Sequence, residues 1–447
     1  MSSKSPEGFA GGIRNNRITW EGCSVLLDIN DGDRVLFARL TAGSKIKLGN
    51  SNCSLQPLIG CPFGSSFEVE VGKDGPFLSR VNPSTEGNNP GEKGDGLIVE
   101  ECRDNRAIVD NNTAQNLTSE DIDDMRRKGA TGDEIVEALI ANSATFDKKT
   151  AFSQEKYRVK KQKKYAPRLL MRRPYTRSIC EAYFKKHAEK IGFLRVDTLS
   201  LLLSLANVTA HSDVLVVDML DGIISGAVAE RLGGTGYVCN TYCGTAPYPI
   251  SIVRMYNFSD ETCKRIVYAS LTELQPSCSQ TSTATDEIKE QENILPSSSA
   301  MDMETMEECC NENTEPVNNV SASPKSGKSI KAGDKAPAEA IKSWKENGFS
   351  SLIVAAPDVD VWGIVKELVP LLAYSAPFVV YHQYLQPLAS CMHNLQIEKM
   401  AIGLQLSEPW LREYQVLPSR THPHMQMSSS GGYLLSGIRI SGESSES

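Results

Sequence analysis

Strand-like and helical segments alternate through the second half of the sequence. The strand-like segments are rich in apolar and β-branched residues; they are VLVVD (214–218), YVCNTY (237–242), RIVYASL (265–271), SLIVAAP (351–357) and PFVVY (377–381). Helical segments such as GAVAERLGG separate them. Continuous apolar strands joined by helices are typical of a parallel sheet that is buried on both faces. The alternation therefore predicts a doubly wound α/β domain over residues 179–440, with an antiparallel end.

Residues 18–110 follow a different pattern. Short apolar runs such as RVLFARL and SFEVEV lie between turns rich in Gly, Asn, Asp and Pro. Their even spacing predicts a β domain, either a small barrel or a sandwich. Residues 1–17 and 441–447 are predicted to be disordered tails.

The segment 111–178 is predicted to be a helical and basic linker between these two domains. Thr118 with Asp121, and Thr131 with Glu134, have the spacing of a capping box, so each pair predicts the start of a short helix. A long basic stretch follows, which should begin as a helix and break at Pro167.

The charges of the chain are strongly segregated. Residues 286–315 hold ten acidic residues and one lysine, and they account for the formal net charge of −8. They lie in a segment rich in Ser, Thr, Glu, Pro and Lys that has few large apolar residues. Such a segment buries too little apolar surface to offset its ordering entropy. We therefore predict a disordered insert over residues 275–336.

The turn after VLVVD is where a nucleotide or S-adenosyl cofactor would bind in such a domain. That site needs glycines, so that backbone N–H groups reach the ligand. Here the turn reads MLDGIISG (219–226), with two glycines four residues apart and bulky side chains at Leu220 and Ile223. The sequence favours a turn that only folds over one that binds a cofactor, so we predict no cofactor-binding residues.

Other signs of catalysis are weak. The six histidines form no recognisable catalytic arrangement, and Cys239 and Cys243 are a single C-x3-C pair without the second pair of a zinc site. Asp358 and Asp360 follow a strand, where an enzyme could use them, but a helix-capping role is favoured. We predict no catalytic residue and no metal site. No run approaches 18 apolar residues, so we expect no membrane span.

The basic stretch is the one positive functional signal. Residues 148–177 hold twelve Lys and Arg against one acid, with Tyr157, Tyr165 and Tyr175 interleaved. Cations contact phosphates and aromatic rings stack on bases, so the stretch favours nucleic-acid binding over a solvated helix. Its lysines are also compatible with nuclear import. The predicted RNA-binding residues are Lys160, Lys161, Lys163, Lys164, Arg168, Arg172, Arg173 and Arg177.

Several segments together resemble the non-catalytic subunit of the eukaryotic tRNA adenine-N1 methyltransferase that acts at tRNA position 58. They include LTSEDIDDMRRKGATGDEIVEALIANSATFDKKTAFSQEKY, PFVVYHQYLQPL and WLREYQVLPSRTHPHMQMSSSGGYLLSG. The resemblance covers about residues 110–440 apart from the insert, and the run from Trp410 to Gly437 is the most specific part. The N-terminal β region matches more loosely.

The resemblance implies a Rossmann-like methyltransferase domain preceded by a small β-barrel. It implies a heterotetramer with two copies of this chain and two of a catalytic S-adenosylmethionine-binding subunit, clasping tRNA, and we expect it in the nucleus. The resemblance implies that the catalytic partner carries an Asp in an Asp-Leu-Pro motif, and the matching position in this chain would be Ala355. The partner's glycine-rich cofactor loop would correspond to the degenerate turn MLDGIISG (219–226) of this chain. Arg412 and Arg420 join the predicted RNA-binding residues on this ground.

Two alternatives remain. An active methyltransferase would need the cofactor site that Leu220 and Ile223 obstruct. A stand-alone RNA-binding or translation-initiation factor would use the basic stretch, but gives no reason for a complete α/β domain. Cofactor binding by the isolated chain separates the first alternative from the subunit. Obligate co-purification with a partner separates the second.

Overall fold

The computed structural model describes residues 17–48, 51–72, 75–81, 115–275, 332–416, 421–428 and 430–440. The described residues form two compact units, one ending at Arg173 and the other beginning at Pro174. Most of the two predicted tails, most of the predicted insert and Arg420 lie outside the described residues.

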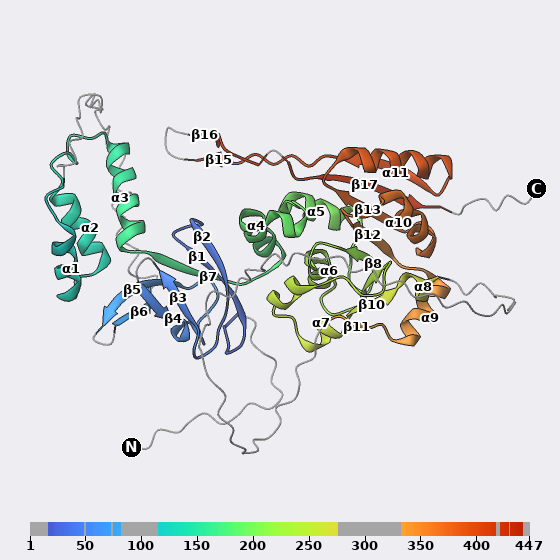
Figure 1. Cartoon of the computed structure of the whole chain (residues 1–447), viewed down its shortest axis with the longest axis horizontal. Coiled ribbons are helices and arrows are strands. Elements are labelled where there is room, and N and C mark those ends of the chain that lie inside the picture. Colours follow the sequence, from blue (N-terminus) through green and yellow to red (C-terminus); the bar gives the residue numbers. More distant parts are fainter. Residues whose placement is uncertain are drawn as a thin grey trace, which may run out of the picture. The chain divides into compact units, whose positions relative to one another are not determined.

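A five-stranded antiparallel sheet forms the centre of the first unit (Figure 1). Its strands, in spatial order, are β2 (Arg34–Arg39), β1 (Ser24–Ile29), β7 (Arg168–Arg172), β5 (Ser66–Gly72) and β6 (Gly75–Arg80). A hairpin of β3 (Lys45–Leu48) and β4 (Ser51–Ser54) lies beside β6. Alternate apolar side chains from these strands, among them Val25, Leu27 and Phe67, form one buried core. Among the described strands β2 and β6 remain the edges of the sheet, so these pairings do not close the predicted barrel.

Strand β7 corrects the predicted linker. The sequence pattern places residues 168–172 in a basic segment outside the β domain, yet they pair with β1 on one side and β5 on the other. Leu169 and Met171 are fully buried in the core of the sheet, while Arg168 and Arg172 point away from it. This period-two alternation is that of a half-buried strand. The segment is therefore part of the first unit's central sheet and not a connection between domains.

Three helices complete the first unit: α1 (Ser119–Arg127), α2 (Gly132–Ala141) and α3 (Ala151–Tyr165). Both predicted capping boxes are confirmed, because the side chain of Thr118 accepts from the amide of Asp121 and that of Thr131 from the amide of Glu134. Ile122, Ile135 and Leu139 form a small buried cluster. Helix α3 ends at Tyr165, two residues before Pro167, as the sequence predicts.

The second unit contains an eight-stranded sheet of the predicted α/β type. In spatial order its strands are β11 (Asp334–Lys335), β10 (Ile266–Ser270), β9 (Tyr237–Tyr242), β8 (Asp213–Asp218), β12 (Ser351–Ala355), β13 (Pro377–His382), β17 (Tyr433–Arg439) and β14 (Ala401–Ser407). The strands from β11 to β13 run parallel, and β17 is antiparallel to both of its neighbours. The chain order reverses between β8 and β12, which is the switch point where doubly wound folds place a ligand.

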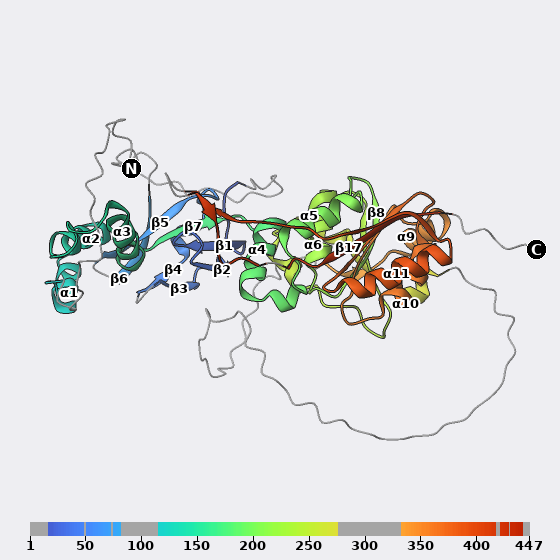
Figure 2. The same ribbon diagram turned by 90° about the horizontal axis from the view of Figure 1, so that it is seen from above.

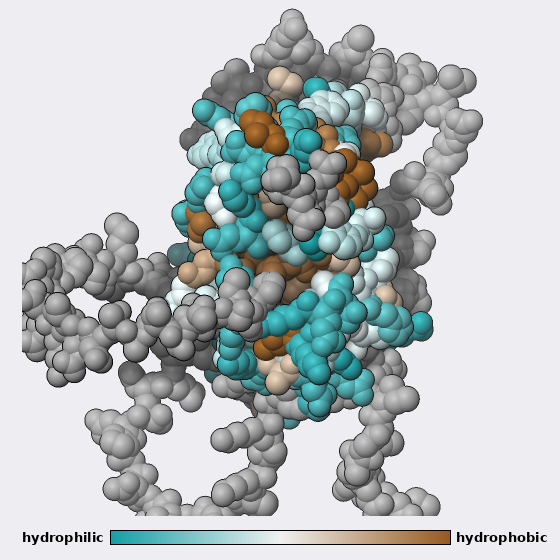
Figure 3. Space-filling model, turned by 90° about the vertical axis from the view of Figure 1, so that its right-hand side faces the viewer, coloured by the Kyte–Doolittle hydropathy of each residue, from teal (hydrophilic) through white to brown (hydrophobic). Residues whose placement is uncertain are grey.

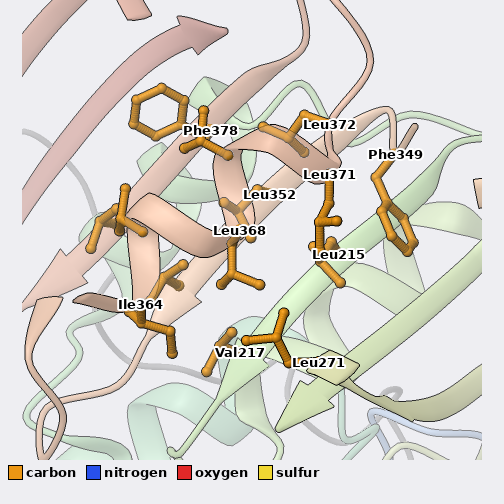
Figure 4. Close-up of a cluster of buried hydrophobic side chains, with 14 of the residues drawn as sticks. Leu215, Val217, Leu271, Phe349, Leu352, Ile364, Leu368, Leu371, Leu372 and Phe378 are labelled. Atoms are coloured by element: carbon orange, nitrogen blue, oxygen red, sulfur yellow. The ribbon is translucent and has the colours of Figure 1, made fainter. Parts of the chain in front are cut away.

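Helices lie on both faces of this sheet (Figures 1 and 2). One set is α4 (Thr176–Lys186), α5 (Val196–Leu205) and α6 (Ile223–Leu232). The other is α8 (Leu271–Leu274), α9 (Ala338–Asn347), α10 (Val361–Leu368) and α11 (Leu385–Ile397), and α7 (Asp260–Lys264) precedes β10. Leu215 and Val217 pack with Leu368 of α10 in one core cluster (Figure 4). Val214 and Val216 are equally buried and face the other way, since side chains alternate along a strand.

The predicted insert extends too far at its C-terminal end. Residues 332–336 are described, and β11 pairs in parallel with β10. The amide of Ala336 donates to the carbonyl of Tyr268 at 2.9 Å, and Ala336 is buried. Lys335 forms an ion pair with Glu273. Residues 276–331 lie outside the described residues, so the rest of the predicted insert stays a prediction.

We expect a variant in which a short Gly/Ser linker replaces residues 276–331 to remain folded, because long surface insertions change loop-closure entropy little. Removal of 275–336 should instead cost about 1 to 2 kcal/mol, because it also removes β11 and its hydrogen bonds. Thermal unfolding of the two variants beside the full chain measures the difference. Equal stability of both variants would show that β11 contributes nothing.

Candidate functional site

The turn at the switch point begins with a carboxylate whose two oxygens accept hydrogen bonds from the protein itself. Asp218, the last residue of β8, is fully buried. One carboxylate oxygen accepts the amide of Leu220 at 3.0 Å, and the other accepts the amide of Ser225 at 2.7 Å and its hydroxyl at 2.9 Å. Burial raises the pKa of Asp218 more than these hydrogen bonds lower it. The carboxylate thus caps the first turn of α6, where a ligand's anionic group could otherwise bind.

Apolar side chains fill the remainder of the turn. Leu220, Ile223 and Ile224 are each at most 1% exposed. A side chain at Gly192 would place its Cβ 2.7 Å from a methyl group of Leu220, which shows how closely Leu220 packs against the backbone at the end of the 3-10 helix Ala188–Ile191. The sequence predicted bulky apolar side chains in this turn, and Leu220 and Ile223 are indeed buried there; that they exclude a cofactor stays a prediction.

A second segment covers the same turn. The short 3-10 helix η5 (Ser251–Met255) is tied to Asp221: the amide of Ile252 donates to the Asp221 carbonyl at 3.0 Å, and the amide of Ser251 donates to its carboxylate at 3.2 Å. Gly222 has φ of +89°, and a Cβ there would lie 2.6 Å from the Cα of Ile250. The segment 250–255 is therefore hydrogen-bonded to the turn and packs closely against Gly222.

The end of β12 provides no acid at the predicted position. Ala355 is fully buried, and its carbonyl accepts the amide of Met219 at 3.0 Å. Asp360 caps α10, accepting the amide of Gly363 at 2.8 Å, which confirms the role favoured for it. Asp358 is exposed.

The two cysteines of the C-x3-C pair are not equivalent. Burial raises the pKa of the fully buried Cys239 thiol far above its usual value, while Cys243 is exposed. These two cysteines thus have different environments. In the described ranges, no group of three His, Cys, Asp or Glu side chains could hold a metal ion. Nor does any helix of those ranges have the length and apolar character of a membrane span.

Four of the predicted RNA-binding cations are paired with acids. Lys163 lies 2.7 Å from Asp33, Arg168 2.9 Å from Glu68, Arg172 3.1 Å from Asp28 and Arg177 2.8 Å from Glu181. Asp28 is only 8% exposed, so its pair with Arg172 belongs partly to the protein interior. An anion would have to compete with a carboxylate at each of these four positions.

The other predicted lysines lie on α3. Lys161 lies over the rings of both Tyr157 and Tyr165, and Lys164 lies over Tyr165, at 5.1 to 5.8 Å from the ring centres. Tyr157 and Tyr165 thus each make cation–π contacts with lysines of this helix. Lys160 is exposed, as are Arg173 and Arg412, while Arg420 lies outside the described residues.

Two basic residues of α3 were missed by the sequence analysis. Lys156 and Arg158 are both exposed on this helix. The spacing of Lys156, Lys160 and Lys164, four residues apart, would have grouped these lysines on one helical face. The number of charges in the stretch indicates a basic surface, and their four-residue spacing is the signal that selects this face of α3.

A buried arginine holds the base of a projecting segment, which we call the arm (residues 408–430). The arm leaves β14, forms a hairpin of β15 (Tyr414–Gln415) and β16 (His422–Pro423), and returns to β17 (Figures 1 and 2). Arg195 makes two hydrogen bonds to the carboxylate of Asp197, at 2.6 and 2.8 Å. It also donates to the carbonyls of Pro409 and Ser428, at 3.0 and 3.1 Å, one on each side of the arm.

The surface of the second unit carries many exposed apolar residues. Figure 3 shows apolar patches between hydrophilic side chains on one face of the molecule. On the arm itself, Trp410 is 69%, Val416 74% and Met425 93% exposed. Residues of this kind are frequent at protein interfaces.

The strand order and the filled turn define the class of protein. A parallel sheet whose strand order reverses at β8, and whose second-to-last strand is antiparallel, is a Rossmann-like methyltransferase fold. In this chain the turn after β8 is packed with the chain's own side chains. The Gcd10p family model matches residues 19–304, which is more than half of the chain. The chain belongs to the Gcd10p family.

The curated relatives have closely agreeing names. A Dictyostelium discoideum protein is 34% identical over 95% of this chain and 80% of its own length, and a Mus musculus protein is 31% identical over 93% and 89%. Both are named tRNA (adenine(58)-N(1))-methyltransferase non-catalytic subunit. Among solved structures, the tRNA (m1A58) methyltransferase TrmI of Aquifex aeolicus aligns over 95% of this chain and 99% of its own, with a TM-score of 0.43 and 11% identity.

Proposed function

We propose that this chain is the non-catalytic subunit of a tRNA (adenine-58-N1) methyltransferase and acts together with a catalytic subunit. The observation that carries the proposal is the filled turn after β8, in which Asp218, Leu220 and Ile223 take the space and the hydrogen bonds that a cofactor would need. The names of the relatives from Dictyostelium discoideum and Mus musculus support it.

In this division of labour the catalytic partner binds S-adenosylmethionine, which supplies the methyl group. This chain contributes contacts that hold tRNA, so that the target adenine stays at the partner's cofactor. Much of an enzyme's rate acceleration comes from such positioning, and a subunit without chemistry of its own can supply it. Exposed lysines on α3 are the described residues best suited to phosphate contact.

The assembly contains two copies of each subunit and acts in the nucleus. The family resemblance supports the stoichiometry, and the exposed apolar residues of the arm are compatible with further protein contacts. The basic run KKQKK at residues 160–164 supports nuclear import.

Purification of the complex from cells through a tag on this chain tests the proposal. We expect one partner in equal amount, a native mass equal to two copies of each subunit, and methyl transfer to tRNA. A tRNA in which another nucleotide replaces adenosine 58 is the matched control and should accept no methyl group at that position. Recovery of this chain alone, bound to RNA, would instead support the stand-alone RNA-binding factor.

A further inference from the structure

Three lysines of α3 share one face of the helix and differ from the ion-paired cations of the basic stretch. Lys156, Lys160 and Lys164 are spaced four residues apart, so they lie along one face of the helix about 6 Å apart per step. All three are exposed, and none of them forms an ion pair with an acid in the part of the chain that the structure describes. We call this set the lysine stripe.

The ion-paired cations form a contrasting set. Lys163, Arg168 and Arg172 belong to the same basic stretch but are bound to Asp33, Glu68 and Asp28. Their charges are balanced within the unit, so the net positive field of this region comes mainly from α3. Arg158 and Lys161 of α3 likewise form no ion pair among the described residues, so the stripe is one part of the uncompensated charge of this helix, and the part that lies along a single face.

Besides the ion pair of Lys163 with Asp33, the side chain of Asn30 ties the end of α3 to the sheet. The side-chain amide of Asn30 makes both bonds: its Nδ2 donates to the carbonyl of Lys163 at 3.0 Å, and its Oδ1 accepts the backbone amide of Arg168 at 3.1 Å. The backbone amide of Asn30 donates to the carbonyl of Arg168 at 2.9 Å. Asn30 thus holds both sides of the break between α3 and β7, and it can do so because its φ of +54° suits asparagine.

The geometry points to a preformed phosphate-contacting surface: we propose that the lysine stripe binds the sugar–phosphate backbone of the tRNA, and that Asn30 is a positioning residue that sets its direction. The proposal rests on the proposed function, because it takes tRNA as the ligand. A helix held at its end loses less conformational freedom on binding than a free basic segment. The paired cations Lys163, Arg168 and Arg172 stabilise the folded unit, and the lysine stripe contacts the RNA phosphates.

The first test replaces Lys156, Lys160 and Lys164 together by alanine in the complete complex with the catalytic subunit. The matched control replaces Lys264, Lys342 and Lys345, three exposed lysines of the second unit, and so removes the same charge. Affinity for tRNA is measured from low to physiological salt. We expect the stripe variant to bind at least tenfold more weakly at low salt and its salt slope to fall by about two to three, with little change in the control.

The second test examines Asn30. Asn30→Gly keeps the positive φ but removes the two side-chain hydrogen bonds. We expect it to weaken tRNA binding several-fold in the normal background and to have no further effect in the stripe variant. Such coupling indicates that Asn30 acts through the lysines and not through general stability. Equal losses in both backgrounds would overturn its positioning role.

The outcomes separate this inference from the proposed function. If the stripe variant assembles, binds tRNA with unchanged affinity and slope, and methylates normally, the lysine stripe is a solvated face and the inference is wrong, while the proposed function stands. If the stripe variant fails to assemble with its partner, the stripe binds an acidic protein surface and the inference is again wrong. If the unaltered complex binds no tRNA, the proposed function itself fails.

Discussion

The chain purified without its partner is expected to bind no S-adenosylmethionine and to transfer no methyl group to tRNA. The turn after β8 is filled by Leu220 and Ile223, and the amides of Leu220 and Ser225 already donate to the carboxylate of Asp218. A cofactor would have to expel buried apolar side chains and break these hydrogen bonds, with no acid at Ala355 to hold the target base. Calorimetry with S-adenosylmethionine and a methyl-transfer assay measure the two quantities.

Two comparisons make this result specific. Addition of the catalytic subunit to the same preparation should produce methyl transfer, which shows that the chain is competent to assemble. Leu220→Gly should not create cofactor binding, because Asp218 still caps α6 and η5 still covers Gly222. Stoichiometric binding of S-adenosylmethionine to the partner-free chain would contradict the non-catalytic role.

The strands of the second unit were predictable because each carries its own signal. VLVVD, YVCNTY and PFVVY are apolar runs that lie within a few residues of β8, β9 and β13 as the structure has them. Strand β7 has no such signal. RLLMR lies among basic residues, and its alternation is explained only by its pairing with β1 and β5, which lie about 140 and about 100 residues earlier in the sequence. Pairing between distant segments is set by tertiary packing, which a local pattern does not report.

The filled turn could be predicted from the sequence in the same way, since glycines are either present at a fixed spacing or absent. The cover provided by η5 could not, because Ser251 and Ile252 reach Asp221 from thirty residues away. The RNA-binding surface shows the larger difference. The count of cations in 148–177 is visible in the sequence, but Asp28, Asp33 and Glu68, which neutralise three of them, come from the N-terminal strands and turns.

Replacement of Arg195 by alanine is expected to lower the free energy of unfolding of the second unit by about 3 kcal/mol. The guanidinium is only 5% exposed, and its loss leaves Asp197 without a counter-charge and the carbonyls of Pro409 and Ser428 without a donor. Because both carbonyls lie at the base of the arm, the arm should open locally. Hydrogen exchange at the amide of His424, which donates to Glu413 within the arm, should become faster.

The pH dependence of this loss identifies its electrostatic part. Burial raises the pKa of Asp197, but the hydrogen bonds and charge of Arg195 outweigh that effect and lower it below its usual value. A carboxyl whose pKa is lowered on folding contributes stability above its unfolded pKa, which is about 3.9, and that contribution disappears as the pH falls through the folded pKa. The difference between the normal chain and Arg195→Ala should therefore be full at neutral pH and shrink below about pH 4. Some difference should remain there, because the two carbonyls still lack a donor.

Arg195→Lys is the matched control: it keeps the charge but cannot reach Asp197, Pro409 and Ser428 together, so it should recover part of the stability and little of the arm's protection. Equal stability and equal exchange at His424 in all three proteins would show that Arg195 does not hold the arm.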